Sequence, residues 1–247
     1  MPRFTLIIPY YRNPEMLQRQ VREWLEYPRE IKFIVVDDGS PEPALPFLHA
    51  ALTPSLRDRL RLYRIKVDIP WNRGGARNLG SFEASDDWIL HVDIDHLLPA
   101  EDAASLVSRR LESEHWYRFA RRRVGKADET RKKDRIPADA EGGEIHPHGD
   151  SYLCQRALYW RVGGYDEDYS GCLGGGSPFL HQLERAAPVK LLTDVHLSVH
   201  TRDAIPDASD LTLPRDRTEY SRRRRDKERR GATAARNPLR FPWERVL

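Results

Sequence analysis

The sequence predicts an α/β protein with a mostly parallel central sheet and helices on its faces. Two observations support this prediction: aliphatic strand-like segments alternate with amphipathic helical segments, and two of the apolar segments stop abruptly at acidic residues. One of them leads into Asp37 and Asp38, and another leads into Asp93 and Asp95. Because parallel strands place their carboxyl ends at one edge of a sheet, we expect these carboxylates to face a common crevice there.

Length and composition fit one large α/β domain. The 247 residues are enough to bury a core, and the net charge of +3 excludes a protein that binds polyanions over its whole surface. Cys154 and Cys172 are the only cysteines, so we expect neither a disulfide framework nor a zinc site. The first residues lack a signal-peptide pattern, and no apolar run approaches the roughly 20 residues that cross a bilayer. We therefore expect a soluble cytoplasmic protein.

The first 36 residues predict a βαβ unit. A strand over residues 4–9 ends at Pro9, and a polar, aromatic loop that contains Tyr11 follows it. Residues 14–26 place apolar side chains at helical spacing behind a proline in the first turn, which predicts a helix. A buried strand over residues 31–36 completes the unit.

The next segments predict a helix, a strand and a glycine-containing loop. Residues 41–60 are punctuated by proline and predict one irregular helix, and residues 60–67 alternate apolar and basic side chains as a half-buried strand does. The motif NRGGARNLG, residues 72–80, is expected to lead into a short helix that ends near Glu83. The two glycines before Ala76 and Arg77 would let the backbone approach a ligand, and a helix N-terminus there would favour anionic groups. A plain loop and helix C-cap is the alternative.

The stretch WILHVDIDH, residues 88–96, predicts a buried strand that delivers two carboxylates to the sheet edge. Residues two apart on an extended chain project to the same side, so Asp93 and Asp95 can converge on one cation. Oxygen ligands of this kind suit Mg²⁺ or Mn²⁺. The alternative is a strand followed by a solvated acidic turn.

Taken together and in order, five motifs resemble those of the family 2 glycosyltransferases with the GT-A fold. The motifs are IIPYYRN, VVDDGS, NRGGARNLG, HVDID and VGGYDEDY, and the resemblance covers about residues 3–200. It implies a Rossmann-like sheet in one domain over residues 1–205, with a nucleotide-binding half (1–98) and an acceptor half (99–205). Residues 206–247 then form a basic C-terminal extension.

The resemblance also implies roles for individual residues. Two hold the metal, and the others bind the base, ribose and diphosphate of a nucleotide sugar. Asp37 is the alternative to Asp38 as the acceptor of the base N–H, His200 has an ordinary strand-end histidine as its alternative reading, and His96 is a further available ligand. The implied metal ligands are Asp95 and His200, and the implied nucleotide-binding residues are Pro9, Tyr11, Asp38, Arg77, Asn78 and Asp93.

The activity that the resemblance implies is an inverting transfer of a hexosyl or hexosaminyl group from a UDP-linked donor to an acceptor hydroxyl, with Mn²⁺ or Mg²⁺. A divalent ion would offset the charge that builds on the departing diphosphate. A carboxylate base would take the proton of the acceptor hydroxyl from the opposite face of the sugar.

The sequence departs from the family pattern at that base. Relatives usually carry Gly-Glu-Asp after the GGYDE turn, whereas here SGCLGGGSPF places Ser177 where the aspartate would be. The replacement candidates are Asp150, Asp166, Glu167 and Asp168, with Asp150 preferred over Asp168. A structural role in a turn or cap is the alternative for all four. A binding module that has lost transfer is therefore the rival function. A nucleotidyltransferase is disfavoured because no lysine-bearing, glycine-rich loop lies near the first strand.

Two basic runs remain. Residues 118–135 predict a solvated charged loop, with a loop that orders over a donor or an anionic acceptor as the alternative. Residues 221–230 predict a charged surface helix that could contact a lipid head group at a membrane surface or a glycan phosphate, while nucleic acid is disfavoured. The last nine residues are expected to pack back on the domain or to join the interface of a homo-oligomer.

Overall fold

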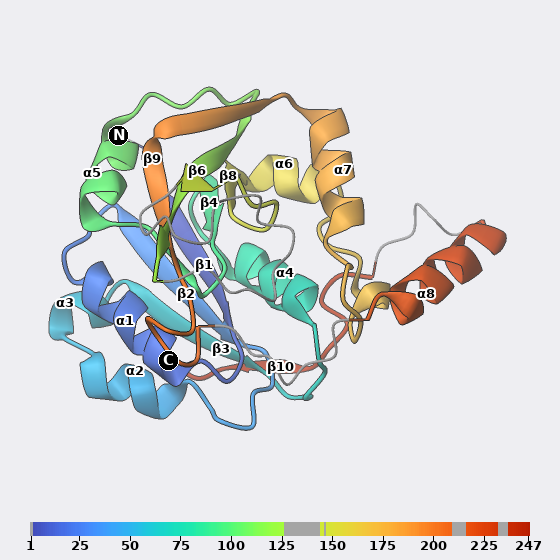
Figure 1. Cartoon of the computed structure of the whole chain (residues 1–247), viewed down its shortest axis with the longest axis horizontal. Coiled ribbons are helices and arrows are strands. Elements are labelled where there is room, and N and C mark those ends of the chain that lie inside the picture. The colour runs from blue at the N-terminus through green and yellow to red at the C-terminus, as the bar shows by residue number, and fades with distance from the viewer. Residues whose placement is uncertain (1, 126–143, 146, 209–215, 232–236) are drawn as a thin grey trace.

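The structure, a computed structural model, describes residues 2–125, 144, 145, 147–208, 216–231 and 237–247. Within these residues one sheet of ten strands is covered by helices on both faces (Figure 1). The strand order is β10-β3-β2-β1-β4-β8-β6-β9-β5, and β7 pairs with β6 beside this path. The predicted α/β fold with a central, mostly parallel sheet is confirmed.

The parallel part of the sheet comes from the first hundred residues. Its four strands, in spatial order β3-β2-β1-β4, are β1 Phe4–Tyr10, β2 Ile31–Asp37, β3 Leu60–Ile65 and β4 Trp88–His91. The remaining strands are mostly antiparallel to their neighbours: β5 His96–Leu97, β6 Trp116–Val124, β7 Glu144–Ile145, β8 Tyr152–Gln155, β9 Val189–His200 and β10 Trp243–Arg245. The exception is the parallel pair of β6 and β9.

The helices divide into two layers, each with its own apolar core. One layer consists of α1 Pro14–Trp24, α2 Leu45–Ala51, α3 Pro54–Arg57 and α5 Ala100–Ser108, whose buried residues share one cluster. The other consists of α4 Arg73–Glu83, α6 Arg156–Arg161 and α7 Ser177–Ala186. A 3₁₀ turn, η1 Glu167–Tyr169, and α8 Thr218–Arg229 complete the set, and α8 projects from the body of the molecule (Figure 1).

Strand β1 runs between the two cores, and every one of its residues is buried. Leu6 and Ile8 point into the core beneath α1, while Ile7 points into the core beneath α4. A strand buried on both faces reads as a continuous apolar run, which is why residues 4–9 were recognisable from the sequence. Each fully buried aliphatic side chain here contributes about 1.5–3 kcal/mol to the free energy of folding.

Pro9 lies inside β1 and does not end it, so the predicted base-binding loop begins later than expected. In the pairing of β1 with β4, Ile7 lies opposite His91 and is the last paired residue. The backbone groups of Pro9, like those of Ile7, point toward β4, which has already ended at this level of the sheet. The missing N–H of proline therefore costs no ladder hydrogen bond, and β1 continues to Tyr10, whose hydroxyl donates to the Glu42 carbonyl at 2.9 Å.

Two predicted segments differ in detail from the structure. Residues 41–60 form the two short helices α2 and α3, because Thr53 leaves the helix and caps α3 by accepting from the Leu56 N–H. The glycines of residues 72–80 lie in the helix itself, since α4 begins at Arg73. A Cβ on Gly80 would collide with Ile7 of β1, so this glycine allows α4 to pack closely on the sheet.

The strand that carries Asp93 is shorter than predicted. β4 ends at His91, and a turn follows in which the His96 N–H donates to the Asp93 carbonyl at 2.9 Å. The extended alternation that was expected to align Asp93 with Asp95 is therefore wrong. Asp93 precedes this turn and Asp95 lies within it.

The first basic run is a strand over much of its described length. Residues 116–124 form β6, in which Arg121 and Arg123 are buried, so the prediction of a solvated loop is wrong there. The rest of the run, residues 126–135, lies outside the described residues. The predicted charged helix at residues 221–230 is confirmed as α8.

The C-terminus packs back on the domain. Strand β10 pairs antiparallel with β3, and Val246 and Leu247 pack against the core beneath α2. Both cysteines are buried and free. Within the described residues, none of the helices combines the length and apolar character that a membrane crossing requires.

Candidate functional site

The parallel strands β2, β1 and β4 end at one edge of the sheet, and the predicted site residues follow these ends. Helix α4 joins them: the Asn72 amide, just before the helix, donates to Asp38 Oδ1 at 2.8 Å, and Arg77 within it donates to Asp93. Asp38 and Asp93 are thus attached to the same helix. The structure places them along one edge, as the parallel arrangement predicted.

Asp37 and Asp38 have different roles. The Asp37 carboxylate accepts the Ser40 N–H at 2.8 Å and the Ala44 N–H at 3.0 Å, and it pairs with Arg64 at 3.1 Å. These contacts hold the turn after β2. Asp38 makes the Asn72 contact instead, and burial raises its pKa well above the ordinary value, with the Asn72 hydrogen bond opposing the shift. Of the two acids, Asp38 is the better candidate for a ligand.

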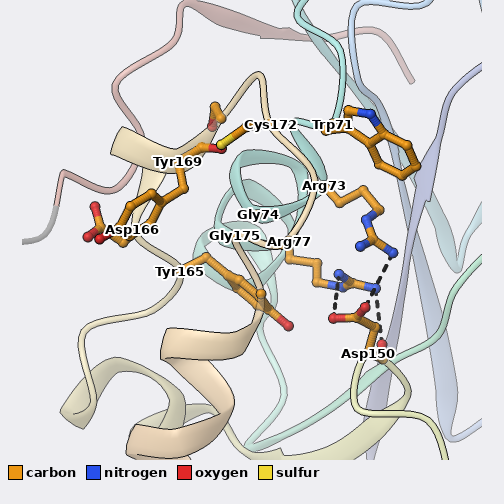
Figure 2. Close-up of a pocket in the computed structure, with 13 residues that line it drawn as sticks. Trp71, Arg73, Gly74, Arg77, Asp150, Tyr165, Asp166, Tyr169, Cys172 and Gly175 are labelled. Atoms are coloured by element: carbon orange, nitrogen blue, oxygen red, sulfur yellow. Dashed lines mark hydrogen bonds and ion pairs between the residues drawn. The ribbon is translucent and has the colours of Figure 1, made fainter. Parts of the chain in front are cut away.

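Two arginines and two carboxylates, Asp93 and Asp150, form the centre of the site. Figure 2 shows the two arginines with Asp150. Arg77 is 1% exposed; it donates to the Asp150 carbonyl at 3.0 Å and lies 3.5 Å from Asp150 Oδ1. Arg73 lies 3.3 Å from Asp150 Oδ2 and 3.6 Å from Asp93 Oδ2. Burial raises the pKa of Asp93 and of Asp150, but the two guanidinium groups outweigh it and hold both pKa values below the usual range. Both acids are therefore ionised at neutral pH.

Three members of this cluster form one side of an open hollow on the protein. Figure 2 shows Arg73, Arg77 and Asp150 on that side, with the Trp71 ring beside Arg73 at the rim. Residues of the GGYDEDY motif and the glycines after it line the other side: Tyr165, Asp166, Tyr169, Ser170, Cys172, Gly174, Gly175 and Gly176. Guanidinium groups in such a place can pair with phosphate oxygens, and an ionised carboxylate can accept a proton.

Asn78, implied as a partner of the nucleotide, is a brace in the structure. Its amide N–H groups donate to the Tyr165 carbonyl at 2.9 Å and to Glu167 Oε1 at 2.7 Å. Its oxygen accepts from the Tyr159 hydroxyl at 2.6 Å and from the Tyr165 N–H at 2.9 Å. These four bonds use the whole hydrogen-bonding capacity of an asparagine side chain. Asn78 therefore ties α4 to the GGYDEDY motif.

Tyr11 lies just beyond β1 and is partly exposed. Its hydroxyl donates to Asp68 at 2.8 Å, and the Arg12 guanidinium lies 5.3 Å from its ring centroid. An aromatic ring at this position can stack on a base, and its contact with Asp68 fixes the ring beside the segment that leads to α4.

Asp95 and His200 are brought together by the pairing of β5 with β9. The His200 N–H donates to the Asp95 carbonyl at 2.9 Å. The His200 ring is 7% exposed, and its Nδ1 has no hydrogen-bond partner among the described residues. Burial, helped by nearby Arg19, lowers the pKa of His200 and favours the neutral imidazole, the form that binds metals.

A second group of possible metal ligands lies nearer the arginine cluster. Asp93, His96 and His148 each offer a ligand atom, and these atoms lie within 4.8 Å of one another. His148 Nδ1 is 3.5 Å from Asp93 Oδ2, and His96 Nδ1 is 2.6 Å from the Ser151 hydroxyl. Carboxylate ligands suit Mg²⁺ and Mn²⁺, and imidazole ligands suit divalent transition metals such as Zn²⁺ and Fe²⁺. The donor set therefore fits a divalent cation beside Asp93.

The two candidate bases lie in different surroundings. Asp168 pairs with Lys227 at 2.8 Å and with Arg240 at 3.0 Å, which engages it with the C-terminal residues. Asp150 lines the hollow, and a Cβ on Gly176 would lie 3.0 Å from its Oδ1. Gly176 directly precedes Ser177, so the Asp150 carboxylate lies beside the start of α7.

Sequence reasoning missed three residues of this site. Asn72 and Arg73 stand in the NRGGARNLG motif, but their contacts with Asp38 and Asp150 join segments far apart in the chain. His148 stands in HPHGD, two residues before Asp150. A histidine close to a candidate carboxylate was the one available signal.

Comparison with known families matches the arrangement to one of them. The model of the family described as glycosyl transferase family 2 matches residues 5–173, more than half of the chain. The chain belongs to glycosyl transferase family 2. No curated protein sequence matches the chain significantly.

Several solved structures share the fold of this chain. TarS (residues 1–349) from S. aureus in complex with UDP-GlcNAc is 16% identical with a TM-score of 0.61, covering 81% of this chain and 59% of that chain. The mannosyltransferase PcManGT from Pyrobaculum calidifontis, in complex with GDP-Man and Mn²⁺, is 19% identical with a TM-score of 0.57, covering 80% and 56%. GalNAc-T7 with UDP, GalNAc and Mn²⁺ is 11% identical with a TM-score of 0.59, covering 97% and 55%. The chain thus spans less than two thirds of each of these proteins, and the likeness confirms the GT-A fold.

Proposed function

We propose that this family 2 protein is an inverting glycosyltransferase that moves a sugar from a nucleoside-diphosphate donor to an acceptor hydroxyl. The observation that carries the proposal is the cluster of Arg73, Arg77, Asp93 and Asp150 at the carboxyl edge of the parallel strands. Its two guanidinium groups can pair with a diphosphate. Its ionised carboxylates can bind a metal cation and accept a proton. Crevices at this edge are where open α/β sheets bind ligands.

In this proposal each residue at the edge contacts a different part of the donor nucleotide. Asp38 accepts an N–H of the base at Oδ2 while its Oδ1 stays bonded to the Asn72 amide, and Tyr11 stacks on the base. Asp93 contacts the ribose, and Arg77 pairs with the diphosphate. The donors bound in the two related structures, UDP-GlcNAc and GDP-Man, support a hexosyl or hexosaminyl donor, for which we propose UDP as the nucleotide.

Asp150 is the proposed general base. The proposal is supported by its position beside Gly176, because the family's usual base falls at the neighbouring Ser177. Its carboxylate is ionised at neutral pH, as a proton acceptor must be. Asp168 is less suited to this role because Lys227 and Arg240 engage it away from the cluster.

A divalent cation, Mn²⁺ or Mg²⁺, is proposed as the cofactor, and it would offset the charge of the departing diphosphate. Two ligand sets are available, Asp95 with His200 and Asp93 with His96 and His148. The donor atoms of the second set lie close together, and the unpartnered Nδ1 of His200 supports the first.

Binding of UDP, UDP-GlcNAc and GDP-Man with and without Mn²⁺, measured by calorimetry, tests the proposal. We expect metal-dependent binding of at least one of them, and Asp38→Ala should weaken it by about tenfold. Asp58→Ala, an exposed acid away from this edge, is the matched control and should leave it unchanged. A wild-type protein that binds none of the three would reject a UDP-GlcNAc- or GDP-Man-type donor.

Metal titration followed by electron paramagnetic resonance of Mn²⁺ separates the ligand sets. If His148→Ala abolishes Mn²⁺ binding and His200→Ala does not, Asp93, His96 and His148 hold the ion. The reverse result assigns it to Asp95 and His200.

A catalytically impaired nucleotide-sugar binding module is the second candidate, favoured by the serine at the start of α7. Asp150→Asn distinguishes the two. For an enzyme with Asp150 as base, this variant should bind the donor normally and transfer or hydrolyse it at least about a hundredfold more slowly. Donor binding with no turnover in the wild-type protein would favour the module.

A further inference from the structure

Helix α8 has a buried lysine on an otherwise very polar surface. The helix projects from the body of the molecule (Figure 1), yet Lys227 is 2% exposed. Its Nζ lies 2.6 Å from Asp166 Oδ2 and 2.8 Å from Asp168 Oδ2. A lysine is almost never fully buried unless it is paired, and here one ammonium serves two acids of the GGYDEDY motif.

Two further side chains on the same face of α8 hold the same motif. Arg223 donates to the carbonyls of Asp168 at 3.0 Å and Ser170 at 2.6 Å. The Tyr220 ring lies 5.1 Å from the Tyr169 ring. Residues 220, 223 and 227 are spaced as one helical face, so α8 docks through this single row of contacts.

A separate C-terminal stretch reaches the motif through Glu167. This side chain is 1% exposed, and it accepts the Leu239 N–H at 2.7 Å and the Arg240 N–H at 3.0 Å. The same carboxylate accepts from the Asn78 amide of α4 at 2.7 Å. Glu167 therefore joins the C-terminus to the helix that carries Arg73 and Arg77.

The segment that is held in this way, residues 166–176, lines the hollow described above. Beyond η1 it has no strand or helix pairing of its own, and Gly171 and Gly174 adopt positive φ angles of 92° and 110°. The Ser170 hydroxyl donates to Asn72 Oδ1 at 2.5 Å, and Asn72 in turn donates to Asp38. A displacement of the segment would thus reach the base-binding acid through two hydrogen bonds.

We propose that the described C-terminal residues, 216–231 and 237–247, are an integral part of the donor site, in which Lys227 and Arg223 act as positioning residues. They hold the 166–176 segment against α4, so that Ser170 keeps Asn72 and Asp38 in place and Gly176 stays beside Asp150. We call the contacts that hold residues 166–176 against α4 the clamp. Its role in donor binding rests on the proposed function. The clamp itself rests on the contacts of Lys227, Arg223 and Glu167.

Hydrogen–deuterium exchange of the full chain tests the clamp independently of any ligand. In Lys227→Met, amide exchange in residues 166–176 should rise by about tenfold or more, while β1 to β4 keep their wild-type protection. Lys227→Arg, which keeps the charge, should restore much of the protection. Arg224→Met is the matched control, because Arg224 is 59% exposed and pairs with Glu228 on α8 itself. If Lys227→Met unfolds the whole chain, Arg223→Met, which leaves the Lys227 pairs intact, provides the same comparison.

Calorimetric binding of UDP and GDP with Mn²⁺ tests the link to the site. We expect Lys227→Met or Arg223→Met to weaken binding of the nucleotide by about fivefold or more, and Lys227→Arg to recover it. Unchanged exchange in residues 166–176, or an equal rise throughout the sheet, would overturn the clamp. Increased local exchange with unaltered nucleotide affinity would overturn its connection with the site. Absence of nucleotide binding in the wild-type protein would instead reject the proposed function and with it the purpose of the clamp.

Discussion

Gly80 shows how a single residue sets the distance between α4 and the sheet. The helix carries Arg73, Arg77 and Asn78, so its position decides where these side chains lie. A methyl group at Gly80 would overlap with the Ile7 side chain of β1 in a fully buried region. Gly80 therefore serves the packing of α4 on the sheet.

We predict that Gly80→Ala lowers the free energy of unfolding by about 1–3 kcal/mol, because overpacking outweighs the gain in helix propensity. Urea denaturation of both proteins measures the change. Phe82→Ala is a suitable control, since Phe82 lies on the same helix and is 52% exposed. Equal stability of wild type and Gly80→Ala would show that β1 and α4 can separate at no cost.

At the scale of residues, the sequence predicted the acids better than their partners. Asp38 and Asp93 were recognisable because each follows an apolar strand, and strand ends converge in a parallel sheet. Asn72 and Arg73 were not, because their roles depend on which acids face them across the fold. The role of Asn78 as a brace depends on three residues more than 80 positions away in the chain.

At the scale of elements, α1 begins with an unusual cap. Asp207, 191 residues beyond Met16, accepts the Met16 N–H at 2.9 Å and the Glu15 N–H at 2.6 Å. The Asn13 side chain makes no capping bond to the helix. A distant carboxylate therefore satisfies two of the free N–H groups at this helix start and ties the segment after β9 to α1.

We predict that Asp207→Ala lowers the free energy of unfolding by about 1–2 kcal/mol, the usual cost of removing a helix N-cap. Thermal and urea unfolding measure the loss. The free energy of unfolding of Asp207→Asn should lie between those of the wild type and Asp207→Ala, because the asparagine amide oxygen still accepts a hydrogen bond. A loss no greater than that of Asp58→Ala, an exposed acid that caps nothing at α1, would contradict this role.

Elements with one dominant local signal were predictable, and elements defined by tertiary contacts were not. The strands β1 to β3 and helix α1 are apolar at the expected spacing and appear within a few residues of their predicted bounds. The strand β6 reads as a basic loop because four of its nine residues, Arg118, Arg121, Arg122 and Arg123, are arginines. It is a strand because β8 and β9 pair with it on either side.

At the scale of the whole molecule, the positive charge is concentrated on α8. This helix has six basic and three acidic residues, so its formal charge of +3 equals that of the entire chain. Three exposed arginines of α8, Arg222, Arg224 and Arg229, form ion pairs within the helix, as between Arg222 and Asp226 at 3.0 Å. Arg223 and Lys227 face the domain instead.

The last residues close the sheet at its β3 edge. β10 pairs with β3, the Val246 N–H donates to the Leu62 carbonyl at 2.8 Å, and the Trp243 ring packs edge-on against Tyr63 with centroids 5.8 Å apart. An uncovered edge strand presents free N–H and C=O groups to other chains. The C-terminal strand therefore protects β3 in addition to anchoring the stretch that contacts Glu167.

We predict that deletion of residues 241–247 lowers the melting temperature by about 5 °C or more and causes concentration-dependent association, because β3 becomes a free edge and loses apolar cover. Differential scanning calorimetry and analytical ultracentrifugation measure the two effects. Glu244→Gln in the full chain is the control, since it removes only the exposed pair with Lys66 and keeps the strand. If the deletion protein melts at the wild-type temperature and sediments as the full chain does, β10 contributes neither stability nor edge protection. Association without a fall in melting temperature would separate these roles and assign β10 to edge protection alone.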